Sequence, residues 1–511
     1  MQRCSLPLLL AAGALACAAP HPQPATSTLI RGALVYDGSG SPGERRSVRL
    51  AGEQIAEVGD LSPLPGETVV DGTGLALAPG FIDTHSHHAG GIFEHRDAKA
   101  AVSQGITTIV AGQDGDSELP LADFFARLER EPVALNIASY VGHGAVRSKV
   151  LGDDFRRKAR PEEVEAMEEL VAREMAAGAL GLSTGLEYDP GIYSDRGEVL
   201  ALAKVAAAQG GRYISHIRSE DRTFWDAIDE ILTIGRETGM PVQISHVKLA
   251  MKNLWGEAPR LLRLLNEARA AGVNVTADAY PYTYWHSTLT VLFPERDFSN
   301  RKAAEQVLAE IAPPEGLLLG RFAPEPSYVG KTVAEIAALR GTDPAATLMA
   351  LIAESQALAD ETGEGTESVI ATSMTEEDVE QLLAWSGTNV CSDGALNGRH
   401  PRGYGAFTRI LGHYVRERGT FTLAEAIRKM TSLAAQNVGI EGRGRIAPGF
   451  YADVVLFNPR TVSDRATPTD PQAVSVGIER VWVNGKVVYA AGKTTGAYPG
   501  SVLRRKDRRQ T

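Results

Sequence analysis

The sequence predicts an α/β protein with a TIM-type (β/α)8 barrel and a small composite β domain formed by the N- and C-terminal segments. Three observations lead to this prediction. Apolar, strand-like segments alternate with helix-period segments from Phe81 to Ser392. One strand pattern recurs thirty residues later, and short alternating β segments gather near both ends of the chain. Functional side chains are therefore expected at the C-terminal ends of the barrel strands.

Length and composition are those of a soluble globular protein and do not favour a nucleic-acid-binding one. The chain has 511 residues, of which 43% are hydrophobic and 23% charged, and its formal net charge is -11. That length allows one large α/β domain and a smaller one. The acidic balance gives no support for a nucleic-acid surface. The sequence does not determine an oligomeric state.

Residues 1–17 have the features of a signal peptide: a positive start at Arg3, an apolar run and small residues at the end. Two processing sites stay open, an A-x-A site at Ala14 to Ala16 and a lipobox-like Cys17. We expect an exported protein, either periplasmic or lipid-anchored to the bacterial envelope through Cys17. Residues 18–28 are predicted to be a linker. Only Cys391 remains in the folded body, which excludes a disulfide scaffold.

The two ends of the chain predict one β domain. Residues 29–78 contain short alternating apolar segments separated by glycine, and residues 445–495 show the same pattern with an Asn484-Gly485 hairpin signal. The middle, residues 79–444, is expected to insert between them as a unit. Residues 496–511 are predicted to be a tail.

The middle of the chain contains eight predicted barrel strands. They are Phe81–Ser86, Thr107–Ala111, Ala134–Tyr140, Leu180–Thr184, Tyr213–His216, Val242–His246, Val273–Ala277 and Asn389–Ser392. Val369–Thr372 would be a ninth, which does not fit the count. The segment from about residue 293 to 366 is too long for a loop, so we predict that it is an insertion with its own helices.

Histidines follow three of these strands. His85 and His87 are two residues apart, which on a strand places both imidazoles on one side. Tyr213–Arg218 recurs as Gln243–Lys248, so His216 and His246 occupy equivalent positions on adjacent βα units and should converge. An isolated HxH is more often a pair of hydrogen-bonded histidines, but repeated placement at strand ends favours a divalent transition metal. Asp393 adds a carboxylate at the last strand end.

The order of HxH, two separated strand-end histidines and a final aspartate resembles the amidohydrolase superfamily. Longer motifs resemble the N-acyl-D-amino-acid deacylases (D-aminoacylases): STGLEYDPGIY at 183–193, SHIRSE at 215–220, GMPVQISHVK at 239–248, DAYPYT at 278–283 and HPRGYGAF at 400–407. The resemblance covers about residues 29–488. It implies metal-dependent hydrolysis of the amide bond of N-acyl-D-amino acids, which releases a carboxylate and a D-amino acid, so the expected partner is a small-molecule substrate.

The resemblance also implies a ligand set and one or two Zn²⁺ per chain. In the family's pattern His216 and His246 hold the tight metal, and His85 and His87 face a second position. The family typically has a metal-binding cysteine in G-N-C-G, whereas this chain has Asp114 in G-Q-D-G. A carboxylate there can bridge two ions. The expected metal ligands are His85, His87, Asp114, His216, His246 and Asp393.

Asp393 is the predicted catalytic residue. Zinc lowers the pKa of bound water to about 7 and polarises an amide carbonyl, and a carboxylate must then pass a proton to the departing amine. For the substrate's carboxylate the family suggests Lys248, Tyr280 and Arg402. Segments in which this chain departs from the family suggest three more pocket residues: Glu187, Tyr188 and His286.

Several alternatives remain at this point. A dipeptidase for peptides with a C-terminal D residue is possible because Glu187 or Asp189 could bind a free ammonium. Another amidohydrolase acting on a linear amide is also possible. A cyclic-amide hydrolase usually needs a carbamylated lysine on the fourth strand, and Leu180–Tyr188 contains no lysine. A metal-binding protein without catalysis would not need Asp393 or Arg402.

Overall fold

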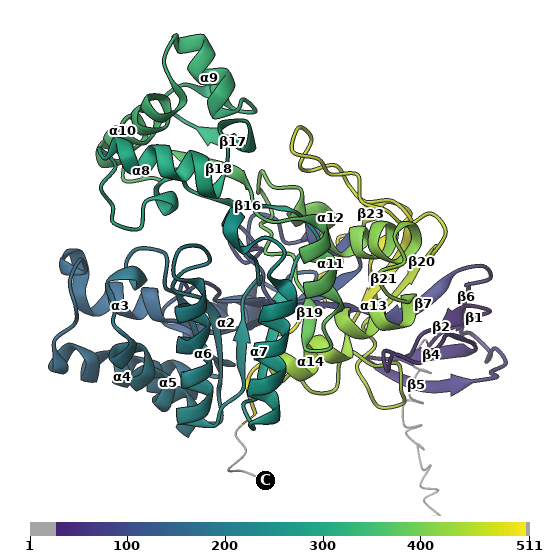
Figure 1. Cartoon of the computed structure of the whole chain (residues 1–511). Helices are drawn as coiled ribbons and strands as arrows, with labels where there is room; N and C mark the ends of the chain where they lie inside the picture. The colour runs from purple at the N-terminus through teal and green to yellow at the C-terminus, as the bar shows by residue number, and fades with distance from the viewer. Residues whose placement is uncertain (1–26, 507–511) are drawn as a thin grey trace, which may run out of the picture.

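The computed structural model describes residues 27–506 (Figure 1). The predicted signal peptide, Cys17 and most of the predicted linker lie outside the described residues. Within them, strands and helices alternate through the middle of the chain, and both ends contribute β structure on the same side of the molecule (Figure 1).

Eight parallel strands follow one another in sequence order if β10 and β11, two parts of one extended segment, are counted together. One sheet contains β8 (Phe81–Asp83), β9 (Ile106–Ala111) and β10 (Asn136–Ser139), and the next contains β11 (Val141–Gly142), β12 (Gly181–Gly185), β13 (Arg212–His216), β14 (Val242–Ile244), β15 (Val275–Ala279) and β19 (Thr388–Val390). Only Tyr140 separates β10 from β11. Each of the eight predicted strand segments overlaps one of these strands, with bounds that differ by a few residues. Their residues are almost entirely buried, as expected for parallel strands covered by helices.

The first and last of these strands meet at their C-terminal ends. Asp393 N–H donates a hydrogen bond to His85 O at 2.9 Å, and His87 N–H donates to Gly394 O at 2.9 Å. Ser392 N–H donates to the buried Asp83 Oδ1 at 2.8 Å. These bonds bring the histidine-bearing end of β8 against the aspartate that follows β19.

Helices cover the outside of the parallel strands (Figure 1). On α6, Phe224, Ile228, Ile231 and Ile234 are buried, and the helix ends at Gly239, whose φ of 67° is accessible to glycine at little cost. The helices outside the insertion are α1 (Lys99–Val102), α2 (Leu121–Arg130), α3 (His143–Leu151), α4 (Pro161–Ala177), α5 (Arg196–Ala208), α6 (Phe224–Thr238), α7 (Ala258–Ala270), α11 (Glu376–Ala384), α12 (Arg402–Arg409), α13 (Leu423–Met430) and α14 (Ser432–Val438).

Two sheets form the β structure contributed by the chain ends. The first has the order β5-β4-β1-β6, and the second β23-β22-β21-β20-β7-β2-β3. Antiparallel pairing of β7 with β20, in which Val454 faces Pro79, joins the N-terminal and C-terminal segments. The bounds are β1 (Thr28–Arg31), β2 (Leu34–Val35), β3 (Glu44–Arg45), β4 (Ser47–Ala51), β5 (Gln54–Gly59), β6 (Thr68–Asp71), β7 (Ala76–Pro79), β20 (Val454–Phe457), β21 (Ile478–Val483), β22 (Lys486–Ala490) and β23 (Lys493–Thr494).

Residues 284–372 form a separate insertion lobe above the parallel strands (Figure 1). Its antiparallel sheet, β16 (Tyr284–Ser287), β18 (Glu367–Thr372) and β17 (Leu317–Phe322), carries α8 (Arg301–Gln306), α9 (Val333–Arg340) and α10 (Pro344–Thr362). The candidate ninth strand lies in β18 and pairs within this lobe, so it is not a barrel strand. The lobe's sheet extends beyond the predicted bounds 293–366 on both sides, because β16 and β18 pair across the insertion.

Among residues 27–506, no single helix is long and apolar enough to cross a membrane; only α9 and α10 together, bent by 96°, reach the required length and composition. Part of the predicted tail packs on the body. Leu503 N–H donates to Ile137 O at 2.8 Å, and Arg505 N–H donates to Gly178 O at 3.0 Å. Arg504 pairs with Glu129 at 2.7 Å.

Candidate metal centre and active site

A cavity of about 700 Å³ opens at the C-terminal ends of the parallel strands. Its wall combines residues that follow those strands with lobe residues such as Trp285 and Ile311. His87, His216 and His246 line it, while His85 is fully buried just behind. The four histidines predicted from the sequence are therefore brought to one place.

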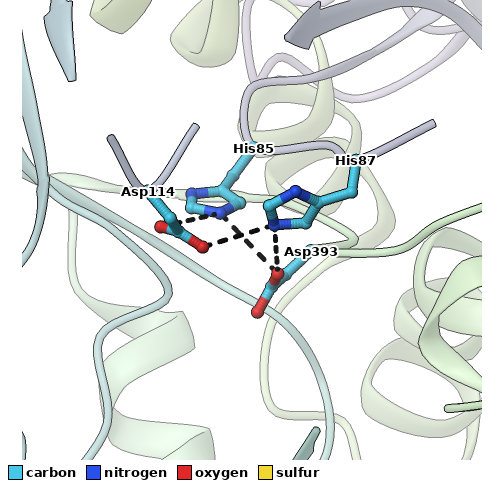
Figure 2. Close-up of side chains that lie close together, drawn as sticks. All are labelled: His85, His87, Asp114 and Asp393. Atoms are coloured by element: carbon cyan, nitrogen blue, oxygen red, sulfur yellow. Dashed lines mark ion pairs between the residues drawn. The ribbon is translucent and has the colours of Figure 1, made fainter. Parts of the chain in front are cut away.

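Four side chains form the first group (Figure 2). His85 Nε2 and His87 Nε2 each lie 3.3 Å from a different carboxylate oxygen of Asp114. Asp393 Oδ1 lies 3.2 Å from His87 Nε2 and 3.7 Å from His85 Nε2. Figure 2 shows the two imidazoles and two carboxylates pointing toward a common centre.

Asp114 also belongs to a second group, with His216 and His246. His246 Nε2 lies 3.4 Å from Asp114 Oδ1 and 3.1 Å from His216 Nδ1. The Asp114 carboxylate thus faces both histidine pairs: Oδ1 lies near His85 and His246, and Oδ2 lies near His87. This is the arrangement expected of a ligand shared between two metal positions.

The spacing of these atoms fits zinc. Two ligand atoms at about 2.0–2.1 Å from a tetrahedral zinc are about 3.3 Å apart. The separations in the second group, 3.1 and 3.4 Å, and those between Asp114 and the first histidine pair match this value. Both ring nitrogens of His85 and Oδ1 of Asp114 are buried without a hydrogen-bond partner. Buried polar atoms normally have partners, so these atoms fit ligands of a cation.

Three of these residues have left-handed backbone conformations. Asp114 has a φ of 53°, His246 of 33° and Asp393 of 49°. For residues other than glycine this conformation is uncommon and concentrates at functional sites. All three residues line the cavity.

The two aspartates are held as carboxylates. Burial alone would raise the pKa of Asp393, but the Arg402 guanidinium, at 2.6 Å, and the neighbouring histidines hold it well below its usual range. Burial also opposes ionisation of Asp114, while His85 and His246 lower its pKa well below the ordinary value. Ionised carboxylates of this kind are available as metal ligands and as proton acceptors.

Two of the three predicted carboxylate-binding residues line the cavity. Lys248 and Arg402 line it, and each already contacts a protein carboxylate: Lys248 Nζ lies 2.7 Å from Glu220 Oε1, and Arg402 pairs with Asp393. Tyr280 does not line the cavity. The centre of its ring lies 4.8 Å from Arg402 Cζ and 5.8 Å from Lys248 Nζ. Its hydroxyl is buried without a partner.

The other three predicted pocket residues all line the cavity. Glu187 contacts the protein through both oxygens: His216 Nε2–H donates to Oε2 at 2.9 Å, and Glu220 N–H donates to Oε1 at 2.8 Å. Burial raises the pKa of Glu187, and its hydrogen bond with His216 opposes this. The Tyr188 hydroxyl lies 3.1 Å from His216 Nδ1. His286 has an unpartnered Nε2, and burial lowers the pKa of its ring to about 4.

Three site residues were not among the predictions. Glu220 pairs with Lys248, and Asp278 Oδ1 accepts the His246 backbone N–H at 2.5 Å. His400 lines the cavity and donates from Nε2 to Tyr284 O at 3.0 Å. One signal for Glu220 existed, since a lysine that follows a buried strand needs a carboxylate partner.

Comparison with known proteins gives consistent matches over nearly the whole chain. Residues 68–312 and 300–489 match the amidohydrolase family. The chain is 37% identical to an N-acyl-D-glutamate deacylase of Alcaligenes xylosoxydans xylosoxydans, covering 93% of this chain and 96% of the relative. It is 36% identical to a D-aminoacylase of the same organism, covering 93% and 97%. The solved structure of an N-acyl-D-glutamate deacylase from Bordetella bronchiseptica, complexed with zinc and a phosphonate inhibitor, has a TM-score of 0.84 at 34% identity, covering 93% and 99%.

Proposed function

The chain belongs to the amidohydrolase family, and from this premise we propose that it hydrolyses the amide bond of N-acyl-D-amino acids, releasing a carboxylate and a D-amino acid. One observation supports this most strongly. Asp114, His216 and His246 place ligand atoms 3.1–3.4 Å apart beside Asp393, which is the constellation of a metal-dependent hydrolase. Zinc is the proposed metal, because the donor set suits it and the Bordetella bronchiseptica relative holds it.

The residues around the metal ligands have distinct proposed roles. Zinc, when bound, would supply an activated water and polarise the amide carbonyl. Asp393 takes the proton of the attacking water and delivers it to the departing nitrogen, since an amide nitrogen leaves poorly without protonation. Arg402 and Lys248 bind the substrate's α-carboxylate, for which the planar guanidinium is well suited.

We propose that the preferred side chain is neutral rather than acidic. Among the described residues that line the cavity, Lys248 and Arg402 are the only lysine or arginine, and both already contact a carboxylate. The α-carboxylate of the substrate would occupy them. A second carboxylate, as in D-glutamate, would face an acidic lining without a cation of its own. The lobe instead supplies apolar wall: Trp285, Val291, Leu292 and Ile311.

The dipeptidase alternative is less well supported by the same geometry. It requires Glu187 or Asp189 to bind a free ammonium. Both Glu187 oxygens accept protein hydrogen bonds, and Asp189 Oδ1 pairs with Arg296 at 3.0 Å. A substrate ammonium would therefore have to share each carboxylate with its existing partners.

We further propose that the eight parallel strands close into a (β/α)8 barrel and that the protein is exported. The bonds between His85 O and Asp393 N–H and between Gly394 O and His87 N–H support closure. Export rests on the sequence of residues 1–17, and attachment to the membrane on Cys17. A shared Asp114 is compatible with either one or two zinc ions per chain.

A substrate panel with metal analysis tests this function. The zinc-loaded enzyme would be assayed with N-acetyl-D-leucine, N-acetyl-D-glutamate, N-acetyl-L-leucine and glycyl-D-leucine. We expect the highest kcat/KM for N-acetyl-D-leucine and loss of activity after chelation. A preference for the L substrate or the dipeptide would refute the proposed reaction, while a preference for N-acetyl-D-glutamate would refute only the proposed side-chain class.

A further inference from the structure

We propose that Glu187 is a positioning residue that fixes the ring of His216 for metal binding, and that the insertion lobe holds Glu187 in place through Arg296. The inference rests on the proposed metal centre at Asp114, His216 and His246. It concerns a residue at which this sequence departs from the deacylases it resembles, and it links a lobe far along the chain to the metal ligands.

The contact with Glu187 fixes the tautomer of His216. A carboxylate can only accept a hydrogen bond, so the contact of 2.9 Å with Glu187 Oε2 places the proton on His216 Nε2. The other ring nitrogen, Nδ1, then carries a lone pair. Nδ1 is the atom that lies 3.1 Å from His246 Nε2, on the metal side of the ring. A carboxylate behind a metal-ligating imidazole fixes its orientation and raises its basicity.

A carboxylate also lies behind the ring of His246, but it shares that place with an ammonium. Glu220 Oε1 lies 3.2 Å from His246 Nδ1, Lys248 Nζ lies 2.7 Å from the same nitrogen, and His246 Nε2 faces Asp114. The two carboxylates are themselves joined, because Glu220 N–H donates to Glu187 Oε1 at 2.8 Å. The ring of His216 therefore meets a carboxylate on the side away from the metal position, whereas the ring of His246 meets the Glu220–Lys248 ion pair there.

The same side chains could be read as a separate cation site, since Glu187, His216 and Glu220 cluster together. Two facts argue against that reading. Both Glu220 oxygens already lie 2.7 and 2.9 Å from Lys248 Nζ, so the ammonium occupies the place of a cation. A metal on His216 Nε2 would also require the ring to bind cations through both nitrogens at once. The contact with Glu187 is therefore assigned as a hydrogen bond.

Arg296 connects the insertion lobe to this contact. Its guanidinium donates to Glu187 O at 2.8 Å and to Asp189 Oδ1 at 3.0 Å, and it also donates to Thr290 O and Phe293 O within the lobe. The side chain is only 17% exposed, so these bonds are partly shielded from water. Arg296 has a φ of 54°, a left-handed conformation that it shares with Asp114, His246 and Asp393. Four donated bonds and a costly backbone conformation are what a clamp between the lobe and the Glu187 loop requires.

The test measures zinc release rather than turnover. Zinc-loaded wild-type protein and the variants E187A, E187Q and E187D would be mixed with an excess of a chromogenic chelator, and the release rate recorded. We expect E187A to release zinc about 10- to 100-fold faster, because loss of the partner of a metal-ligating histidine lowers metal affinity by a factor of this size. E187Q should lie between, because its amide oxygen still accepts the bond. The visible spectrum of the Co²⁺-loaded protein should change in E187A, which a purely structural role would not produce.

A second set of variants tests whether Arg296 links the lobe to Glu187. R296A should speed zinc release in the same direction as E187A, and the double variant should release no faster than E187A alone, since both act through one contact. R301A is the matched control: Arg301 pairs with Asp343 at 3.0 Å inside the lobe and should leave the rate unchanged. D116N is the second control, because Asp116 lines the cavity and is exposed.

Three outcomes would overturn the proposal. Wild-type release rate and an unchanged Co²⁺ spectrum in E187A would remove Glu187 from the metal centre. Loss of one metal equivalent in E187A, with unchanged release of the rest, would show that Glu187 is a ligand instead. Full additivity of R296A and E187A would break the link to the lobe. Failure of the metal centre itself is separate: H216A and H246A would then bind as much zinc as wild type.

Discussion

Replacing Asp114 by asparagine removes the one carboxylate shared by both histidine pairs. Its oxygens lie 3.3 Å from His85 and His87 and 3.4 Å from His246. The substitution D114N is preferable to D114A because asparagine, like aspartate, tolerates the φ of 53° found there, whereas alanine in this conformation costs about 1–2 kcal/mol. The side chain keeps its volume and loses its charge.

The magnitude follows from the ligand groups. Without the Asp114 carboxylate, one metal position keeps only His216 and His246, and the other keeps His85, His87 and Asp393. Loss of a mere partner of a ligand costs about 10- to 100-fold in affinity, so loss of a charged ligand should cost at least about 100-fold, or about 2.8 kcal/mol. The position at His216 and His246, reduced to two neutral ligands, should lose its metal first.

The assay is metal content after dialysis against a graded zinc buffer, measured together with turnover. D114N should lose metal and activity in parallel while it stays folded, because Asp114 Oδ1 makes no hydrogen bond that the fold needs. D114C is the control, since a thiolate is a good zinc ligand and should retain one tight ion and partial activity. If D114N holds zinc as tightly as wild type and hydrolyses as fast, Asp114 is a turn residue and the shared-ligand reasoning is wrong.

Three further predictions test other parts of the structure. D393N should lower kcat about 10²- to 10⁴-fold while zinc at His216 and His246 is retained, since an amide cannot transfer the proton; near-normal turnover would exclude Asp393 from proton transfer. Burial raises the pKa of Glu367 in the insertion lobe to about 7, so the folded state favours its protonated form and stability should fall by about 3 kcal/mol as pH rises from about 4.5 through 7. Denaturation midpoints at pH 5 and 8 should differ less in E367Q, and an equal difference in both proteins would contradict this. If the lipobox interpretation of Cys17 is right, labelled fatty acid should enter the chain and be lost in C17S; an unlabelled, soluble wild-type protein would leave signal-peptidase processing alone.

Local sequence was sufficient for features whose physical cause is local. Asn484-Gly485 predicted a hairpin because these residues accept positive φ, and the turn between β21 and β22 has φ values of 47° and 75° there. The recurring pattern around His216 and His246 predicted adjacent equivalent strands, and His216 Nδ1 lies 3.1 Å from His246 Nε2. Strand periodicity and repeat spacing express backbone geometry, which each segment carries by itself.

Other features depend on contacts between segments far apart in the chain, and no local pattern encodes them. Val369–Thr372 has the composition of a barrel strand, but pairing with β16 and β17 places it in the insertion lobe. Glu187 looked like a substrate ligand, until the fold brought His216 and Glu220 to its two oxygens. Arg296 reaches Glu187 across 109 residues of sequence. The sequence by itself thus determined which residues could bind metal, whereas the tertiary structure decided which carboxylates remain free to do so, because that depends on which distant donors each one meets.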